Sequence, residues 1–406
     1  MIYRTLSKTI KKAMKTFPAV VVTGPRQSGK TTLLRNLLKK SHQYINLENP
    51  DIRIKAQDDP NGFLKQFTKP VILDEIQYVP DLLSYIKSLI DEKRKPGFWI
   101  LTGSQNFVLM QNVSQSLAGR AAILSLLPFS LTERLNKGQK TLSFDKLLKK
   151  NNILAKNNNE KLLTEILSRG FFPEITINKK VDKDLWSGSY ITTYLERDVR
   201  NLSQVGDLNQ FERFLKACAV RTGQILNLSE IARDIGISVP TAKKWLSLLE
   251  TGYQVFLLYP YYRNIGKRLI KSPKIYFNDP ALAAYLLGLR DKKALFNSSH
   301  FGNLFETLII VDFWKRYLHF GMQPSMYYLK TRDGLEVDLA LEFNQKLYLF
   351  EIKSSSTITL KHASSLLKVK NDIGSLVKTT NIISQSKSGL IGRKIDNYNW
   401  FDLLSI

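Results

Sequence analysis

The chain has 406 residues, 43% of them hydrophobic and 23% charged, so it is long enough for two or three domains with their own cores. This composition excludes wholesale disorder, and a single cysteine, Cys218, excludes intrachain disulfides and cysteine-based zinc sites. Lysine and arginine outnumber aspartate and glutamate by 60 to 35, a net charge of +25 that favours nucleic acid as a partner before an anionic membrane surface. An AT-rich genome that encodes lysine and asparagine freely is the alternative source of this charge.

The amino terminus predicts a basic amphipathic helix, because Ile2, Leu6, Ile10 and Met14 recur at helical spacing among lysines. It has no apolar stretch of the kind that a signal peptide needs. No apolar run in the chain approaches the ~18 residues that span a bilayer. The sequence therefore predicts a cytoplasmic protein without a membrane segment.

A glycine-rich loop follows the apolar, β-branched residues 19–23 and precedes residues 32–38, which have helical spacing. Its glycines let backbone N–H groups turn towards phosphates, and the helix amino terminus adds partial positive charge. Lys30 is expected to reach the β- and γ-phosphates, and Thr31 to supply a hydroxyl to Mg²⁺. Thr32, the next residue, is a further candidate for nucleotide binding. The sequence therefore predicts that ATP with Mg²⁺ binds to a phosphate loop, the P-loop, formed by Gly24, Pro25, Arg26, Gln27, Ser28, Gly29, Lys30 and Thr31.

Residues 70–75 predict a buried parallel strand that ends in two carboxylates, a Walker B pattern. Asp74 is expected to hold Mg²⁺ through its water shell, and Glu75 to polarise the water that attacks the γ-phosphate. Residues 44–47 predict the strand of the βα unit between the two motifs. Two solvated acids at a strand end are the alternative interpretation.

A third buried strand is predicted at residues 98–101, and the polar residues after it, Ser104 and Gln105, are candidates to sense the γ-phosphate or position the water. Arg120 precedes another apolar run, residues 121–127. It is a candidate to reach a phosphate of its own nucleotide or of a neighbouring subunit's, as an arginine finger does. A surface or salt-bridged arginine is the alternative.

The order of these motifs resembles the AAA-type ATPases. The chain is more closely similar to one prokaryotic family of AAA-like ATPases, whose carboxy-terminal domain is named only as a domain of unknown function. The resemblance covers nearly the whole chain and implies an α/β ATPase core. It rests on the sequences at residues 24–27 (GPRQ), 73–77 (LDEIQ), 101–104 (LTGS), 117–120 (LAGR) and 194–199 (YLERDV).

Residues 228–238 have the spacing of a helix and a tight turn, with Gly236 where a left-handed residue is needed. A second helix, capped by Ser238, is expected to follow. Residues 255–259 and 274–277 then predict two strands joined by a basic segment. The whole resembles a winged helix that binds DNA, and a packing module beside the ATPase is the alternative. The candidate DNA contacts are Thr241, Lys243, Lys244, Arg263, Lys267, Arg268 and Lys271.

Residues 334–341 and 347–353 predict a hairpin, in which alternation places Glu351 and Lys353 on one face and Asp338 on the partner strand. With Glu306 on a preceding helix, this arrangement resembles the PD-(D/E)XK nuclease superfamily. The resemblance implies that Asp338 and Glu351 hold Mg²⁺ or Mn²⁺, that Lys353 orients or deprotonates water, and that Glu306 completes the metal shell.

Composition and motifs predict four regions: an AAA-like P-loop core at residues 1–160, a lid-like helical segment at 161–205, a winged helix at 206–280 and a nuclease-like α/β domain at 281–406. The predicted function is Mg²⁺-dependent ATP binding and hydrolysis with DNA as a partner. Phosphodiester hydrolysis is a separate hypothesis, because a fold does not guarantee an activity. A non-cutting ATP-dependent switch and a protein-interaction ATPase are the alternatives.

Overall fold

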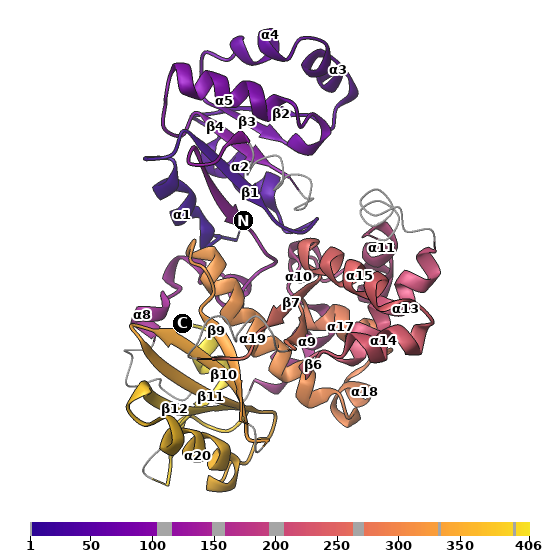
Figure 1. Cartoon of the computed structure of the whole chain (residues 1–406), viewed down its shortest axis with the longest axis vertical. Helices are drawn as coiled ribbons and strands as arrows, with labels where there is room; N and C mark the ends of the chain where they lie inside the picture. Colours follow the sequence, from indigo (N-terminus) through magenta and orange to yellow (C-terminus); the bar gives the residue numbers. More distant parts are fainter. Residues whose placement is uncertain are drawn as a thin grey trace. The chain divides into compact units, whose positions relative to one another are not determined.

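The computed structural model describes residues 2–103, 116–147, 159–194, 207–262, 272–331, 334–392 and 395–406, without the side chain of residue 145. These residues form two compact units (Figure 1). The first contains Met1–Phe129, Thr251–Tyr253 and Leu318–Met322, and the second contains Ser130–Glu250, Gln254–Tyr317 and Gln323–Ile406.

The first unit is built on a five-stranded sheet in the order β2-β3-β4-β1-β5, in which every strand pairing is parallel. Apolar side chains alternate between its two faces: Ala19 and Val21 enter one core cluster, Val20 and Val22 the other. Both faces are therefore buried, as in α/β folds with helices on each side. The strands are β1 (Ala19–Thr23), β2 (Gln43–Asn46), β3 (Val71–Asp74), β4 (Trp99–Thr102) and β5 (Ala121–Ser125). The first four confirm the predicted strands, and β5 lies within the apolar run at residues 121–127.

Helices cover both faces of this sheet. The predicted amphipathic helix is confirmed, since Leu6 and Ile10 are fully buried in the same cluster as Leu33 and Leu34. Helices from the middle of the unit contribute to the other cluster, for example through Phe63. The helices are α1 (Leu6–Ala13) and α2 (Lys30–Leu38) on one face, and α3 (Pro50–Asp58), α4 (Pro60–Lys65) and α5 (Leu82–Glu92) on the other.

The second unit begins before residue 160, where the sequence places the end of the ATPase core. The Leu131 backbone N–H donates to the Asp312 carboxylate at 2.6 Å, and Phe144 stacks on Tyr317 with ring centroids 4.0 Å apart. These buried contacts tie the segment after Phe129 to the second unit rather than to the parallel sheet.

Helices dominate the first part of the second unit, including the segment predicted to be lid-like, of which residues 195–205 lie outside the described part. Phe172, Trp186 and Tyr190 form an aromatic cluster with ring centroids 4.7 to 5.3 Å apart. The helices are α7 (Leu131–Arg134), α8 (Phe144–Leu147), α9 (Glu160–Arg169), α10 (Pro173–Ile177), α11 (Lys183–Thr193), α13 (Leu208–Val220), α17 (Pro280–Leu286) and α18 (Lys292–Asn297).

The predicted helix, turn and second helix are confirmed as α14 (Leu228–Ile235) and α15 (Val239–Thr251). Gly236 between them has φ of 73°, the left-handed conformation that glycine adopts at low cost. The Ser238 hydroxyl accepts from the Thr241 N–H at 3.2 Å, as predicted for a cap. An antiparallel sheet in the order β6-β8-β7 accompanies them, formed by β6 (Gln224–Ile225), β7 (Val255–Leu258) and β8 (Lys274–Phe277).

A six-stranded mixed sheet, in the order β13-β14-β12-β11-β10-β9, forms the carboxy-terminal part. The predicted hairpin is confirmed: β10 and β11 pair antiparallel around Asn344 and Gln345, whose φ of 48° and 58° suits a two-residue turn. Phe313 packs on Phe350 with ring centroids 5.9 Å apart. α20 contributes Leu366 to the apolar cluster of this part. The elements are α19 (Phe301–His319), β9 (Met326–Lys330), β10 (Glu336–Phe343), β11 (Lys346–Lys353), α20 (Ser364–Ile373), β12 (Val377–Ser384), β13 (Gly389–Ile391), β14 (Ile395–Asn399) and α21 (Trp400–Leu404).

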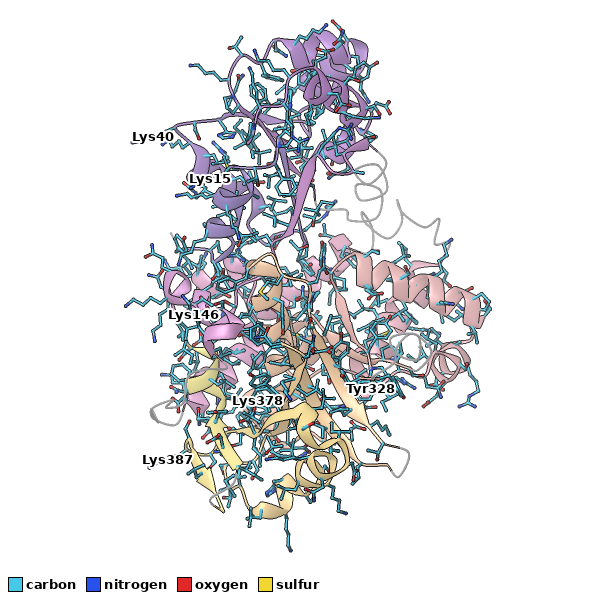
Figure 2. The ribbon with its side chains drawn as sticks, turned by 60° about the vertical axis from the view of Figure 1, so that its left-hand side comes forward. Lys15, Lys40, Lys146, Tyr328, Lys378 and Lys387 are labelled. Carbon is cyan, nitrogen blue, oxygen red and sulfur yellow. The ribbon has the colours of Figure 1, made fainter. Side chains whose placement is uncertain are left out.

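No helix among the described residues has both the length and the apolar composition needed to cross a membrane. Exposed lysines contribute to the net charge, and four of them, Lys15, Lys40, Lys378 and Lys387, project outwards (Figure 2).

Candidate functional site

The P-loop lies between the end of β1 at Thr23 and the start of α2 at Lys30. Gly24 and Gly29 have φ of 142° and 91°, conformations that glycine adopts without a side-chain clash. A Cβ at Gly24 would lie 2.1 Å from the Leu126 carbonyl oxygen. The close approach of the loop to the segment after β5 therefore requires glycine at this position.

Lys30 lies inside the loop, with a relative exposure of 5%. Its ammonium donates to the carbonyl oxygens of Gly24 and Pro25 at 2.9 and 3.0 Å. The Ser28 hydroxyl is buried and has no hydrogen-bond partner among the described residues. The loop thus gathers an ammonium and an unsatisfied donor where phosphate oxygens are expected.

Thr31 and Asp74 meet at the carboxyl edge of the sheet. The Thr31 hydroxyl donates to Asp74 Oδ2 at 2.7 Å, and the Tyr44 hydroxyl donates to the same oxygen at 2.7 Å. The Thr102 hydroxyl donates to Asp74 Oδ1. Hydroxyl and carboxylate oxygens are ligands that Mg²⁺ accepts, so these residues fit the predicted ion.

Glu75 follows β3 with φ of 58°, a left-handed conformation that is rare for a glutamate and common at functional sites. Its N–H donates to the Thr102 hydroxyl at 3.4 Å, and the Gln77 amide donates to Glu75 Oε2. Glu75 is therefore held just beyond the strand end, beside Asp74. Ser104 and Gln105, the predicted sensors, lie outside the described residues.

The structure does not bring Arg120 to the P-loop. Arg120 immediately precedes β5, and its carbonyl oxygen accepts from the N–H of Ala19, the first residue of β1. Because β1 and β5 run parallel, this is the edge of the sheet opposite Thr23. The guanidinium instead forms a two-point ion pair with Asp91, at 2.6 and 2.8 Å. Contact with a neighbouring subunit's nucleotide stays a prediction.

Arg4 is a P-loop contact that the sequence did not reveal. It has a relative exposure of 4%, and its guanidinium donates to the Ser28 carbonyl at 2.7 Å and to the Leu127 carbonyl. The guanidinium carbon also lies 4.8 Å from the ring centroid of Phe129. Arg4 thus links the P-loop to the chain segment that leaves β5.

Replacing Arg4 by lysine is expected to weaken ATP binding by roughly tenfold, about 1.4 kcal/mol, because an ammonium cannot bridge two carbonyls with the fixed geometry of a guanidinium. Titration of a fluorescent ATP analogue measures this change. Lys12→Met on the exposed side of α1 is the control. An unchanged dissociation constant for Arg4→Lys would show that the link does not shape the P-loop.

The second unit brings the four predicted carboxy-terminal residues together. Lys353 Nζ lies 2.7 Å from Glu351 Oε1 and 4.0 Å from Asp338 Oδ2, which also accepts from the Ile352 N–H at 2.8 Å. Glu306 of α19 is joined to Asp338 through the ammonium of Lys274, which lies 3.2 Å from Glu306 and 3.7 Å from Asp338.

Lys274, Tyr276 and Glu336 are members of this cluster that the sequence reasoning missed. Lys274 Nζ lies 2.6 Å from Glu336 Oε1, and the Tyr276 hydroxyl donates to Glu306 Oε1 at 2.6 Å. Glu336 lies two residues before Asp338 on one strand, so alternation along β10 was a usable signal. A lone lysine at the start of the buried strand β8 was a weaker one.

Burial and the nearby Asp338 carboxylate raise the pKa of Glu306 to about 7 and that of Glu351 to about 8. Burial lowers the pKa of Lys274, but Glu306, Asp338 and Glu336 outweigh it and raise that pKa above its ordinary value. Lys274 therefore carries a positive charge, and the carboxylates around it need cations to remain ionised together.

The predicted metal shell is not seen as a whole. No group of three or more histidine, cysteine, aspartate or glutamate side chains in the described part of the chain is arranged to hold a metal ion. Glu351 nevertheless has a relative exposure of 6%, and its Oε2 atom has no hydrogen-bond partner there. Asp338 and Glu351 thus fit as metal ligands, while Glu306 is engaged by Lys274 and Tyr276.

Of the predicted DNA contacts, the described residues include three, all on α15. Lys243 and Lys244 are exposed, and the half-buried Thr241 shares a hydrogen bond with Ser238 at 2.8 Å. The other four, Arg263, Lys267, Arg268 and Lys271, lie outside the described residues.

Comparison with known proteins divides the chain into three matched regions. Residues 16–135 match a family described as an AAA domain. Residues 160–293 and 301–394 match two families described as domains of unknown function, DUF8612 and DUF4143. The first match covers the P-loop, Asp74 and Glu75, and the third covers Glu306, Asp338, Glu351 and Lys353.

Two mycobacterial proteins, Rv2008c of Mycobacterium tuberculosis and Mb2031c of Mycobacterium bovis, are each 31% identical to this chain over 362 residues. The matched part covers 89% of this chain and 76% of each relative. The chain belongs to the Rv2008c family. Both relatives are named as uncharacterized proteins, so membership of the Rv2008c family assigns no activity.

Some solved structures are more distantly similar to this chain. The Walker-type ATPase paby2304 of Pyrococcus abyssi is 16% identical with a TM-score of 0.43, over 70% of this chain and 94% of that chain. A RuvB variant of Thermotoga maritima is 17% identical with a TM-score of 0.31, over 63% and 89%. The AAA-domain match and the parallel sheet with its P-loop identify the first unit as a Walker-type P-loop ATPase domain.

Proposed function

We propose that this chain is a Mg²⁺-dependent ATPase whose nucleotide state controls the engagement of DNA. The observation that carries the proposal is the hydrogen bond from Thr31 to Asp74 at 2.7 Å, which joins the two halves of a Mg²⁺–ATP site. A bound Mg²⁺ would neutralise charge on the β- and γ-phosphates. The rate of phosphate release from ATP, compared between the wild type and Glu75→Gln, tests the proposal.

The residues of the site divide the work between binding and hydrolysis. Lys30 and the backbone of residues 24–32 bind the phosphates, and Thr31 and Asp74 hold the ion. Glu75 accepts a hydrogen bond from the attacking water and draws its proton away from the developing bond. Gln77 holds Glu75 in place for this step. Ser104 is proposed as the γ-phosphate sensor, and Arg120 as a residue that acts on a neighbouring subunit's nucleotide.

The proposal of DNA as partner is supported by the second unit. The helices α14 and α15 with the antiparallel sheet β6-β8-β7 are similar to a winged helix, whose second helix enters a DNA groove. Lys243 and Lys244 are exposed on that helix, and the net charge of the chain is +25. Since α15 exposes lysines and contains no base-reading arginine, the proposed binding is governed by phosphate contacts.

Replacing Lys243 and Lys244 together by glutamate is expected to weaken duplex DNA binding by roughly tenfold or more. The slope of the logarithm of the binding constant against the logarithm of the salt concentration is expected to fall in magnitude by about two. Fluorescence anisotropy of labelled duplex over a salt series measures both. The matched control replaces Lys15 and Lys40, two exposed lysines of the first unit, by glutamate (Figure 2). Absence of wild-type binding even at low salt would favour a protein-interaction ATPase instead.

A second candidate function is metal-dependent phosphodiester hydrolysis at the carboxy-terminal cluster. It is favoured by the buried Oε2 atom of Glu351, which has no hydrogen-bond partner in the described part of the chain, and by the Lys353 ammonium 2.7 Å from the other oxygen of Glu351. Asp338 and Glu351 would hold a Mg²⁺ or Mn²⁺ ion that binds the scissile phosphate, and Lys353 would orient the attacking water. A non-cutting switch is the alternative.

Replacing Asp338 by asparagine is expected to reduce Mn²⁺-dependent nicking of supercoiled plasmid by roughly 100-fold or more, because the amide is a poor metal ligand but can still accept from the Ile352 N–H. Conversion of the plasmid to its nicked form measures the rate. Asp372→Asn, on the exposed end of α20, is the control. Equal residual nicking by wild type and Asp338→Asn would remove the nuclease proposal and leave the non-cutting switch.

A further inference from the structure

We infer that Lys274 is an internal cation that competes with a divalent metal ion for the carboxy-terminal carboxylates, so that the cluster takes up a metal only when Lys274 withdraws. The inference rests on the proposed metal site at Asp338 and Glu351. It adds a regulatory residue that lies outside the helix and hairpin that carry the four predicted groups.

The Lys274 ammonium is placed as a bound cation would be. It has a relative exposure of 3% and lies 2.6 Å from Glu336, 3.2 Å from Glu306 and 3.7 Å from Asp338. The ring centroid of Tyr328, the tyrosine labelled in Figure 2, lies 5.7 Å from the ammonium. A buried ammonium requires such compensation, and here three carboxylates supply it.

Lys274 already engages Asp338, one of the two carboxylates on which the proposed metal site depends. Three acidic side chains lie within 3.7 Å of the Lys274 ammonium, and the described residues contain no group of three or more histidine, cysteine, aspartate or glutamate side chains arranged to hold a metal ion. A divalent ion at Asp338 would lie close to the ammonium, because both use the same carboxylate, and the two positive charges would repel each other in a buried site. The Oε2 atom of Glu351 remains the ligand that Lys274 does not engage.

Lys274 comes from a different sheet from its partners. It is the first residue of β8, the central strand of the sheet β6-β8-β7, whereas Asp338 and Glu351 belong to the six-stranded sheet. Tyr328 joins the two sheets: its hydroxyl donates to the Ser272 carbonyl at 2.8 Å, and its N–H donates to the Tyr259 carbonyl at 3.1 Å.

This connection gives the competition a regulatory consequence. Because β8 pairs with β7, which directly follows α15 in the chain, a ligand that shifts the three-stranded sheet also shifts Lys274. A ligand bound to α14 and α15 therefore changes how readily the site at Asp338 and Glu351 binds a metal ion. The metal-ion affinity of the site measures this coupling.

The test is Mn²⁺ binding to the nucleotide-free full-length chain, followed by electron paramagnetic resonance and referred to Asp338→Asn as the background. We expect Lys274→Met to bind Mn²⁺ roughly tenfold tighter than wild type, because removal of the competing charge leaves the carboxylates to the ion. The control is Lys330→Met, which removes an exposed cation 3.4 Å from the same Glu336 and is expected to change the affinity little.

A measurement on the wild type guards against misfolding of the variant. Acetylation of lysines, mapped by mass spectrometry, is expected to spare Lys274 without metal and to modify it once Mn²⁺ is bound. Equal Mn²⁺ affinity of wild type and Lys274→Met, or Lys274 labelling that Mn²⁺ leaves unchanged, would overturn the competition. Binding by neither protein above the Asp338→Asn background would overturn the metal site itself, and the nuclease proposal with it.

Discussion

Replacing Lys30 by methionine is expected to weaken ATP binding by roughly 100-fold or more, because the phosphates lose their charge-assisted contact. Lys30 is buried inside the P-loop, where its ammonium donates to the Gly24 and Pro25 carbonyls. A phosphate oxygen that replaces these carbonyls gains a full charge interaction. Titration of a fluorescent ATP analogue in the presence of Mg²⁺ measures the dissociation constant.

The control for this variant is Lys39→Met, which makes the same change in an exposed lysine that follows α2. It is expected to bind ATP as the wild type does. If Lys30→Met also kept the wild-type dissociation constant, the loop at residues 24–31 would not be the nucleotide site.

Replacing Glu75 by glutamine is expected to slow phosphate release by roughly 100-fold or more while the affinity for ATP stays nearly unchanged. The amide has the shape of the carboxylate but cannot take a proton from the attacking water. Glu75 lies just beyond β3, where Thr102 and Gln77 hold it. Single-turnover phosphate release with saturating ATP separates this effect from binding.

Glu92→Gln is the matched control, since Glu92 is an exposed glutamate at the end of α5. It is expected to hydrolyse ATP at the wild-type rate. A Glu75→Gln chain that also did so would reassign the catalytic base.

The nucleotide site could be predicted because each of its parts is a short motif of contiguous residues. The glycines, Lys30 and Thr31 are contiguous, and the apolar run before Asp74 identifies a buried strand. In a parallel sheet, residues that follow the strands gather at one edge, so the meeting of Thr31 with Asp74 follows from the strand pattern. The same rule places residues that precede a strand at the other edge, which is where Arg120 lies.

Partners supplied from distant parts of the chain could not be predicted in this way. Arg4 reaches Ser28 across 24 residues, and no periodicity in the sequence connects the two. Lys274 was assigned to a separate region ending at residue 280, yet it contacts Glu306 and Asp338. The hairpin and its acids were predictable from alternation, whereas the cation among them depends on how two sheets meet.

The central claim is that the P-loop, Asp74 and Glu75 form an ATP-hydrolysing site that responds to DNA. The most direct measurement is the rate of phosphate release from Mg²⁺–ATP by wild type and Glu75→Gln, each with and without duplex DNA. We predict wild-type turnover that rises when DNA is added, and turnover by Glu75→Gln that is lower by roughly 100-fold in both conditions. Equal rates for the two proteins, a wild-type rate that DNA leaves unchanged, or no wild-type turnover in either condition would contradict the claim.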